Sequence, residues 1–167
     1  MKLMVGLGNR GIRYKKTRHN LGFILLNEYA KEHNLSWKKD RKARALIIRH
    51  EHEDIIFVKP QTFMNSSGIS VSYLMNYYDL GLDDLLVVHD DVDLDFLQTK
   101  LQKGAGPAGH KGVEDIVVSV KSKDFWRFRV GVGRPHSAQM TTEDFILATF
   151  SKQELKEIKN ISLPISG

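Results

Sequence analysis

The glycine motif near the N-terminus is the first stretch whose residue types and spacing could do chemistry. Residues 6–11 read G-x-G-x-x-G after a short apolar run, the pattern of a loop that binds a dinucleotide cofactor. Such a loop needs a helix that opens directly at the glycines and an acidic residue about 20 residues further on. Here polar residues 12–19 follow, and the next expected strand, 43–49, ends in basic residues. We therefore predict no nucleotide cofactor, and instead a tight turn that presents Asn9 at the end of a strand.

A run of aspartates offers a second chemistry. Residues 90–95 include four aspartates, which could ligate a divalent metal for phosphoryl transfer or nuclease chemistry. The alternative is a polar strand end with exposed carboxylates. Strand alternation would put Asp91, Asp93 and Asp95 on one side, opposite Asp90. A metal-dependent phosphohydrolase is therefore kept as an alternative at this point.

The composition indicates an ordinary globular chain. Its 167 residues suffice for one domain with a hydrophobic core, and its 41% hydrophobic and 27% charged residues are typical of that class. No apolar run approaches the length of a membrane span, and the N-terminus lacks the apolar stretch of a signal peptide. The absence of cysteine excludes disulfides, cysteine metal sites and a thiol nucleophile. We expect a cytoplasmic protein.

The formal net charge of +5 has two interpretations. A basic surface favours polyanions such as nucleic acid, but a surplus of lysine is also found on plain solvated surfaces. The basic residues form small clusters rather than one block, at 10–18, 37–44, 100–111 and 121–134.

Hydrophobic periodicity predicts alternating strands and helices. We expect strands at 2–7, 43–49, 55–59, 85–89 and 125–132, with a hairpin turn across 50–54 and weak alternation at 94–101. We expect helices at 21–33, 66–78, 113–121, 141–149 and 152–159, and a glycine-rich loop at 104–112. Strands separated by helices imply an α/β sheet with some mixed pairing. Because no repeat or internal boundary divides the chain, residues 1–167 are expected to form a single domain.

Six short segments carry the most specific signal in the sequence. In order they are GLGNRG (6–11), TRHN (17–20), KPQTFMN (59–65), HDDVD (89–93), AGHKG (108–112) and RVGVGRP (129–135). They resemble the bacterial peptidyl-tRNA hydrolase family, whose blocks are G-x-x-N-P-G, T-R-H-N, K-P-x-T-F-M-N, H-D-x-L-D, G-G-H-N-G and R-I-G-I-G-R-P. Each block alone is a weak signal, but six in order at compatible spacings are specific. The resemblance runs from Met1 to about Leu155.

The resemblance implies a fold, an activity and a set of site residues. The fold is a single domain with a twisted, mixed and largely parallel sheet flanked by helices. The activity is hydrolysis of the ester that joins a peptide to the terminal ribose of a tRNA, without metal or cofactor, by a monomer whose partner is peptidyl-tRNA. By position, His19 is the catalytic histidine, Asp90 its carboxylate partner, and Asn9 lies beside them. The positions implied to bind substrate are Tyr14, Met64, Asn65, His110, Lys111 and Arg129, with Tyr14 at the tRNA end and Arg129 at a tRNA phosphate.

These residue types suit the hydrolysis of an ester. A neutral histidine can take a proton from water near pH 7 and later return it. A carboxylate on the other ring nitrogen fixes the tautomer and stabilises the imidazolium. The amides of Asn9 and Asn65 can donate hydrogen bonds to the reacting carbonyl or hold the water. A serine nucleophile is not expected, since the chain has no G-x-S-x-G motif.

Each assigned residue also has a purely structural explanation. His19 could cap the following helix, Asn9 could be only a turn residue, and Asn65 only a helix cap. Met64 could be ordinary core, and the histidine of the glycine-rich loop could simply fit there. Arg129 could form a cross-strand salt bridge instead of binding phosphate.

Departures from the family pattern keep a rival function open. Arg10 replaces a proline, Lys111 an asparagine of the substrate site, and Gln102 a basic residue that helps to clamp a phosphate. The final residues, NISLPISG, do not resemble the helix with which the family usually continues, so we expect that helix to be missing. The main alternative is a non-catalytic RNA-binding relative on the same fold.

Overall fold

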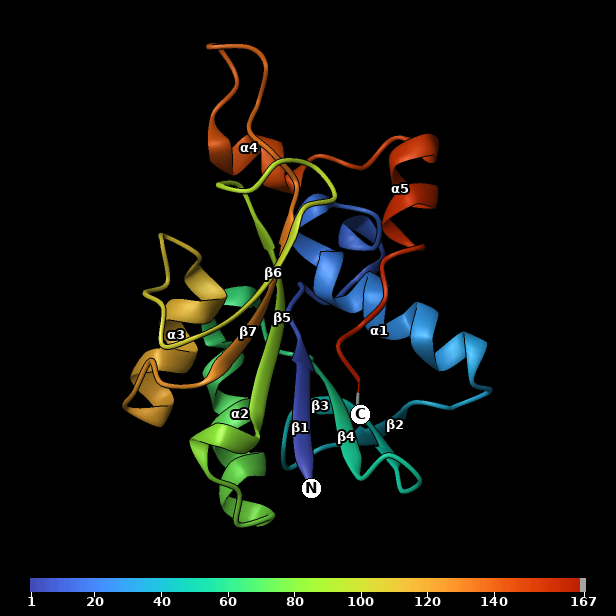
Figure 1. The fold of residues 1–167 in the computed structure, drawn as a ribbon, viewed down its shortest axis with the longest axis vertical. Helices are drawn as coiled ribbons and strands as arrows, with labels where there is room; N and C mark the ends of the chain where they lie inside the picture. The colour runs from blue at the N-terminus through green and yellow to red at the C-terminus, as the bar shows by residue number, and fades with distance from the viewer. Residues whose placement is uncertain (166–167) are drawn as a thin grey trace.

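A seven-stranded sheet forms the centre of the molecule, with helices on both of its faces (Figure 1). The computed structural model describes residues 1–165. The strands are β1 (Lys2–Gly6), β2 (Lys38–Asp40), β3 (Ala45–His50), β4 (Ile55–Pro60), β5 (Leu85–Asp91), β6 (Thr99–Lys103) and β7 (Trp126–Gly131). The helices are α1 (Leu21–Glu32), α2 (Ser67–Tyr77), α3 (Lys111–Val120), α4 (Thr142–Leu147) and α5 (Lys152–Ile158). Short 3-10 helices lie at Ile12–Tyr14, Arg18–Asn20, Met64–Ser66 and Leu82–Asp84.

The centre of the sheet is parallel and its edges are antiparallel. The strand order is β2-β3-β4-β1-β5-β7-β6, in which β4, β1, β5 and β7 run parallel. The register places Gly6 beside Val88, and Asp90 beside Val130. Because the carboxyl ends of parallel strands meet at one edge, the segments that follow these four strands come together there. The predicted α/β class with a mixed, centrally parallel sheet is confirmed.

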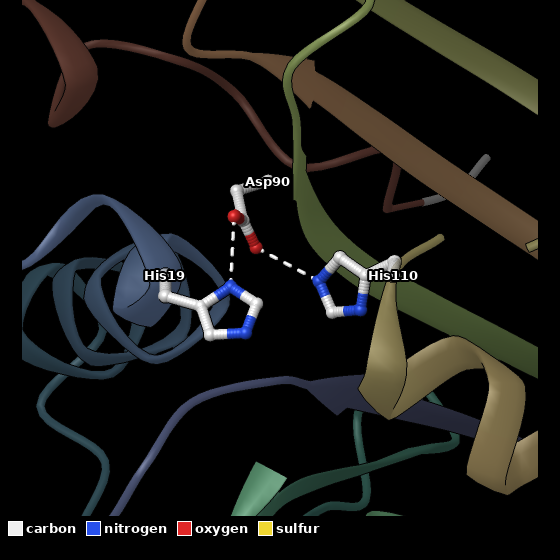
Figure 2. Close-up of side chains that lie close together, drawn as sticks. All are labelled: His19, Asp90 and His110. Atoms are coloured by element: carbon white, nitrogen blue, oxygen red, sulfur yellow. Dashed lines mark hydrogen bonds and ion pairs between the residues drawn. The ribbon is translucent and has the colours of Figure 1, made fainter. Parts of the chain in front are cut away.

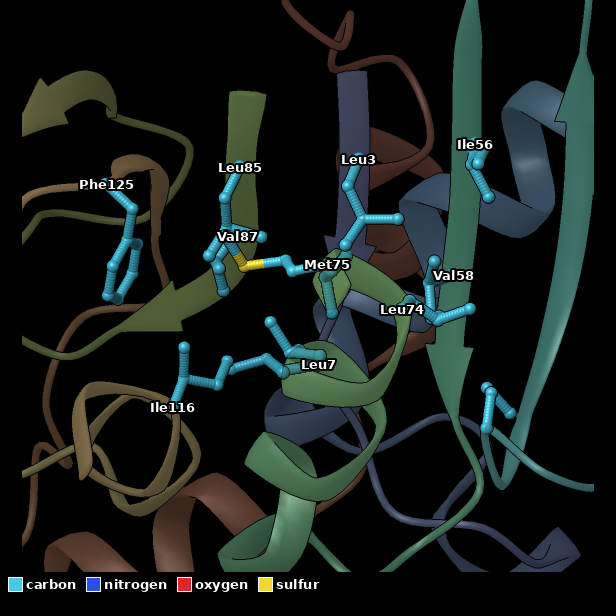
Figure 3. Packing of buried hydrophobic residues seen from close by; sticks show 14 of the residues in the cluster. Leu3, Leu7, Ile56, Val58, Leu74, Met75, Leu85, Val87, Ile116 and Phe125 are labelled. Carbon is cyan, nitrogen blue, oxygen red and sulfur yellow. The ribbon is translucent and has the colours of Figure 1, made fainter. Parts of the chain in front are cut away.

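Alternation along the strands divides the hydrophobic core into two layers. Leu3 of β1 points to the layer under α2 and α3, where it packs with residues such as Leu74 and Ile116 (Figure 3). Its neighbour Met4 belongs to the opposite layer, which contains Leu25 of α1 and the buried side chains of α4 and α5. Fully burying one such side chain contributes roughly 1.5–3 kcal/mol relative to leaving it exposed. The two layers therefore hold the sheet and the loops at its carboxyl edge in place.

The glycine motif lets α1 pack closely against the end of β1. A Cβ on Gly6 would lie 2.5 Å from the carbonyl oxygen of Gly22, and one on Gly8 would lie 2.6 Å from Cγ of Phe23. Gly11 has a φ of 107°, which side-chain-bearing residues rarely adopt. The predicted turn is therefore present, and its first two glycines are explained by close contact with a helix.

The observed elements differ from the predicted ones at a few places. The short edge strand β2 was not predicted, because its sequence KKD has no apolar alternation. The weak alternation at 94–101 belongs largely to a turn, and strand β6 begins only at Thr99. Helix α3 begins at Lys111, where the side chain of His110 accepts a hydrogen bond from the backbone N–H of Val113.

The last described residues do not form a helix. After α5, residues 161–165 have no regular secondary structure, although Leu163 and Ile165 pack against the α1 side of the core. Residues 166–167, the end of the segment NISLPISG, lie outside the described residues. No helix within residues 1–165 is long and apolar enough to cross a bilayer.

Candidate active site

His19 is buried at the carboxyl edge of the sheet, next to Asp90. It lies on the 3-10 helix before α1, and its side chain is 8% exposed. Its Nδ1 lies 2.9 Å from Oδ2 of Asp90, the residue next to the end of β5. The adjacent Arg18 holds this segment against α4, because its backbone N–H donates to the carbonyl of Ala148 at 3.1 Å. The resemblance assigned this pair, and the fold brings it together across 71 positions of sequence.

Asp90 contacts a second histidine through its other oxygen. Nε2 of His110 lies 2.9 Å from Oδ1 of Asp90, so each oxygen of the carboxylate contacts one imidazole ring (Figure 2). His110 precedes α3, and its ring centre lies 4.9 Å from that of His19, so the two imidazole rings are neighbours on the same side of the carboxylate. His110 was assigned to substrate binding, and the structure adds a direct contact with the carboxylate of the pair.

These contacts determine where the ring protons lie. Nδ1 of His110 accepts from the N–H of Val113 at 3.3 Å, so its proton is on Nε2 and is donated to Asp90. Nδ1 of His19 donates to the same carboxylate. In neutral His19 the lone pair is therefore on Nε2, which points away from Asp90 in Figure 2. Such a nitrogen can act as a base.

The pKa values of the pair reflect burial and mutual attraction. Burial alone would lower the pKa of His19, but the charge of Asp90 and its hydrogen bond outweigh burial and raise that pKa above its ordinary value of 6.5. Burial alone would raise the pKa of Asp90, but His19 and His110 hold it well below its ordinary range. Asp90 is therefore ionised whenever His19 titrates.

Asn9 is oriented by three hydrogen bonds. Its Oδ1 accepts from the backbone N–H of Met64 at 2.8 Å. Its backbone N–H and carbonyl pair with the side-chain amide of Asn20, at 2.8 and 2.9 Å. Because the oxygen of Asn9 is engaged, its Nδ2 is the atom left to donate to a ligand. The asparagine of the turn is thus presented to the site with a defined amide orientation.

A cavity of about 480 Å³ joins these residues. Met64, Asn65 and Lys111, all assigned to substrate binding, line it together with His19 and Asn9. The other lining residues are Phe63, His89, Asp90, Asp91, Val92, Pro107, Ala108, Gly109, His110, Arg134, Thr142, Glu143, Ile146 and Leu147. Tyr14 and Arg129 do not line it.

Arg129 is engaged inside the protein. Its Nε donates to Oδ2 of Asp91 at 2.7 Å, and its Nη1 donates to Oε1 of Gln102 at 2.8 Å. The salt bridge considered as its alternative explanation is therefore present, and its contact with a tRNA phosphate stays a prediction. Tyr14 lies under the guanidinium of Arg13, 5.0 Å from the ring centre, and its role at the tRNA end also stays a prediction.

The aspartate run is divided among different partners. Strand β5 ends at Asp91, so the predicted alternation does not continue through Asp93. Asp91 pairs with Arg129, and Asp93 pairs with Arg134. Within residues 1–165, the group with metal-ligand spacing is His19, Asp90 and His110, whose ligand atoms lie within 4.8 Å of one another.

Several residues that support the site were not predicted. Asn20 holds the backbone of Asn9, and its place in the TRHN segment was the available signal. Arg127 is buried and donates to the carbonyl of Gly106 at 2.7 Å, which holds the glycine-rich loop. His89 is buried against His110, with ring centres 4.9 Å apart, and burial lowers its pKa well below the ordinary value.

Comparison with known proteins places this chain in a family. The model of the family described as peptidyl-tRNA hydrolase matches residues 3–165. The chain belongs to the peptidyl-tRNA hydrolase family. It is 43% identical to a peptidyl-tRNA hydrolase of Oceanobacillus iheyensis over 155 residues, which cover 92% of this chain and 82% of the relative. It is 41% identical to that of Idiomarina loihiensis over 160 residues, 95% of this chain and 80% of the relative.

A solved structure agrees with the membership. The crystal structure of a peptidyl-tRNA hydrolase from Acinetobacter baumannii matches with a TM-score of 0.86 at 32% sequence identity. The match covers 95% of this chain and 81% of the other. The resemblance seen in the six sequence segments is therefore confirmed at the level of family and fold.

Proposed function

We propose that this protein hydrolyses the ester between peptide and tRNA in peptidyl-tRNA, with His19 as the general base. The observation that carries the proposal is the buried contact between Nδ1 of His19 and Asp90, at 2.9 Å, in a cavity that Asn9 also lines. Family membership supports the substrate and the reaction.

The first step is attack of water on the ester carbonyl. Nε2 of His19 removes a proton from a water molecule as its oxygen bonds to the carbonyl carbon. Asp90 stabilises the imidazolium that forms and keeps the ring in position. In the second step the bond to the ribose oxygen breaks, and His19 returns the proton to that oxygen. The peptide leaves as a carboxylic acid and the tRNA with a free hydroxyl.

Asn9 is the group we assign to the developing oxyanion. Its Nδ2 can donate to the carbonyl oxygen, because its Oδ1 is held by Met64. A donor that is already oriented needs no reorganisation when charge develops, and loss of one such donor lowers kcat by roughly 10²–10³-fold. Asn65 and Lys111 line the same cavity, and we assign them to holding the substrate.

The rival function is RNA binding without catalysis. A buried carboxylate flanked by two histidines is expensive to desolvate, and such perturbed groups in a cleft are characteristic of catalytic sites. A protein that only bound RNA would need cations on its surface, but not the His19–Asp90 pair inside a cavity. The pair therefore favours the enzyme. We further propose that the protein acts in the cytoplasm as a monomer. Residues of one chain line the cavity, so a monomer suffices for activity.

Turnover of peptidyl-tRNA by His19→Ala tests the assignment. Loss of the general base should lower kcat by roughly 10²–10⁴-fold, while the affinity for uncharged tRNA is retained. His52→Ala is a matched control, because that histidine's side chain is 87% exposed and does not line the cavity. Near-normal hydrolysis by folded His19→Ala would refute the role of His19. Failure of the wild-type protein to hydrolyse peptidyl-tRNA would favour the RNA-binding function.

A further inference from the structure

A second pocket adjoins the catalytic cavity across Phe63. It has a volume of about 480 Å³, and Phe63 lines both pockets. Three separate segments line this second pocket: the glycine turn, the β2–β3 hairpin and the segment after β4. Its lining residues are Arg10, Lys39, Asp40, Arg41, Arg44, Ala45, Gln61, Thr62, Phe63, Ser66 and Ile69. We call it the basic pocket.

The cations of the basic pocket have no partners of their own. Within residues 1–165, the guanidinium groups of Arg10, Arg41 and Arg44 and the ammonium of Lys39 make no hydrogen bond or ion pair. The one carboxylate of the lining, Asp40, uses Oδ1 to accept from the backbone N–H of Ala43 at 2.9 Å. Four exposed cations around a hollow repel one another, and an anion bound between them would relieve that repulsion.

Two cations near β6 and β7 differ in this respect. Arg129 pairs with Asp91, and Lys103 pairs with Asp83. Their charge is already balanced by carboxylates of the same chain, whereas that of the basic pocket is not. Beside the catalytic cavity, the basic pocket therefore brings together four cations that have no carboxylate partner within residues 1–165.

A fixed group of cations suits a part of the substrate that is the same in every peptidyl-tRNA. Peptides on tRNA vary in sequence, while every tRNA carries backbone phosphates through its single-stranded 3′ end. Phe63 at the boundary is 59% exposed, which leaves an aromatic face available for stacking of a base. Oγ1 of Thr62 is buried in the same wall without a hydrogen-bond partner among the described residues, and a hydroxyl can donate to a phosphate oxygen.

We propose that the basic pocket binds a backbone phosphate of the single-stranded 3′ end of tRNA, on the far side of Phe63 from the ester. The inference rests on peptidyl-tRNA being the substrate. It also gives the substrate a direction in the site. The nucleotides before the ester extend from the catalytic cavity past Phe63, and the peptide extends towards the apolar residues Ile146 and Leu147 of α4, which also line that cavity.

The test is binding of a short single-stranded RNA with the sequence of a tRNA 3′ end and no ester. We compare the wild-type protein with the double variant Arg10→Gln, Arg41→Gln across a salt series. Loss of one phosphate contact on a single strand should lower the slope of log K against log salt by about 0.7. The variant should therefore bind more weakly at low salt and approach the wild type as salt is raised.

The matched control removes the same kind of charge elsewhere. Arg49→Gln lies near the opposite end of β3, is exposed, and does not line the pocket, so the wild-type slope should be retained. An unchanged slope in the double variant overturns the proposal. The proposal is also overturned if the double variant slows hydrolysis only of substrates that carry an acidic peptide. The pocket would then hold a peptide carboxylate instead of a phosphate. The binding assay contains no ester, so its result is independent of whether the wild-type protein hydrolyses peptidyl-tRNA.

Discussion

Replacing Asp90 by asparagine should move the proton of His19 to the wrong nitrogen. The carboxylate accepts one hydrogen bond on each oxygen, at 2.9 Å from Nδ1 of His19 and 2.9 Å from Nε2 of His110. Asparagine has the same shape, but it offers one acceptor and one NH₂ donor. One of the two histidines must therefore face a donor instead of an acceptor.

The structure indicates that His19 is the one affected. Nδ1 of His110 already accepts from the N–H of Val113 at 3.3 Å, which keeps the proton of His110 on Nε2. The oxygen of the new amide then faces His110, and its NH₂ group faces Nδ1 of His19. His19 must accept there and carry its proton on Nε2, the atom that should take a proton from water.

The size of the effect has two parts. Loss of the carboxylate from comparable histidine pairs lowers kcat by about 10⁴-fold. The hydrogen bond from Val113 is what favours the unproductive orientation of the amide, and one such bond contributes about 1 kcal/mol. That corresponds to about fivefold in population. The rest of the decrease comes from losing the negative charge that stabilises the imidazolium.

A double-mutant cycle with His110→Phe separates the two parts. Without His110, the amide oxygen is free to accept from Nδ1 of His19. The factor by which Asp90→Asn lowers kcat should then be about fivefold smaller in the His110→Phe background than in the wild type. The assay is single-turnover hydrolysis of peptidyl-tRNA. Equal factors in both backgrounds would refute the reasoning on amide orientation, and nearly normal kcat in Asp90→Asn alone would refute the role of the pair.

Four further outcomes are expected. Asn9→Asp keeps the acceptor for Met64 but puts an anion where the oxyanion forms, so kcat should fall roughly 10²–10³-fold with little change in tRNA affinity. Gly22→Ala puts a methyl group against the backbone of Leu7, and denaturant unfolding should show a loss of about 1–3 kcal/mol. Arg129→Ala leaves Asp91 buried without its partner, so unfolding should become easier by about 3 kcal/mol. If Arg129 also binds phosphate, the salt slope for tRNA should fall by roughly one unit. A chelator should leave kcat unchanged, and inhibition reversed by a divalent ion would contradict that prediction.

Much of the site was predictable because it lies where strands end. The segments containing Asn9 and Asp90 follow or finish apolar strands, and parallel strands bring their carboxyl ends to one edge. His19 lies near the same edge because the short segment before α1 starts from the end of β1. Local sequence therefore indicated the neighbourhood, and the family resemblance supplied the pairing of His19 with Asp90.

The partners of individual side chains were not predictable, because they depend on register. Strands β5 and β7 pair so that His89 lies beside Arg129. The side chain of Arg129 therefore meets Asp91, two residues further along and on the same face. A shift of one residue would turn Arg129 to the other face of the sheet. Neither sequence segment alone determines that register.

The basic pocket could not be predicted from the sequence for a related reason. Arg10 was noted as a substitution in the glycine turn and as part of the basic cluster 10–18, and residues 37–44 were noted as a separate basic cluster. Their approach depends on the short hairpin of β2 and β3, and β2 has no apolar pattern that would have predicted it. A three-residue strand with charged side chains is visible only once its partner is known.

The pKa and tautomer of His19 test the central claim most directly. We expect ¹⁵N NMR of the labelled protein to show a proton on Nδ1 of neutral His19 and a pKa above 6.5, since the Asp90 anion raises it. The base is active only when neutral, so kcat/KM for peptidyl-tRNA should fall with decreasing pH through that same pKa. In Asp90→Asn both the NMR pKa and the kinetic limb should move to lower pH. A proton on Nε2 in the wild-type protein, or a kinetic pKa that does not follow that of His19, would contradict the assignment of His19 as the general base.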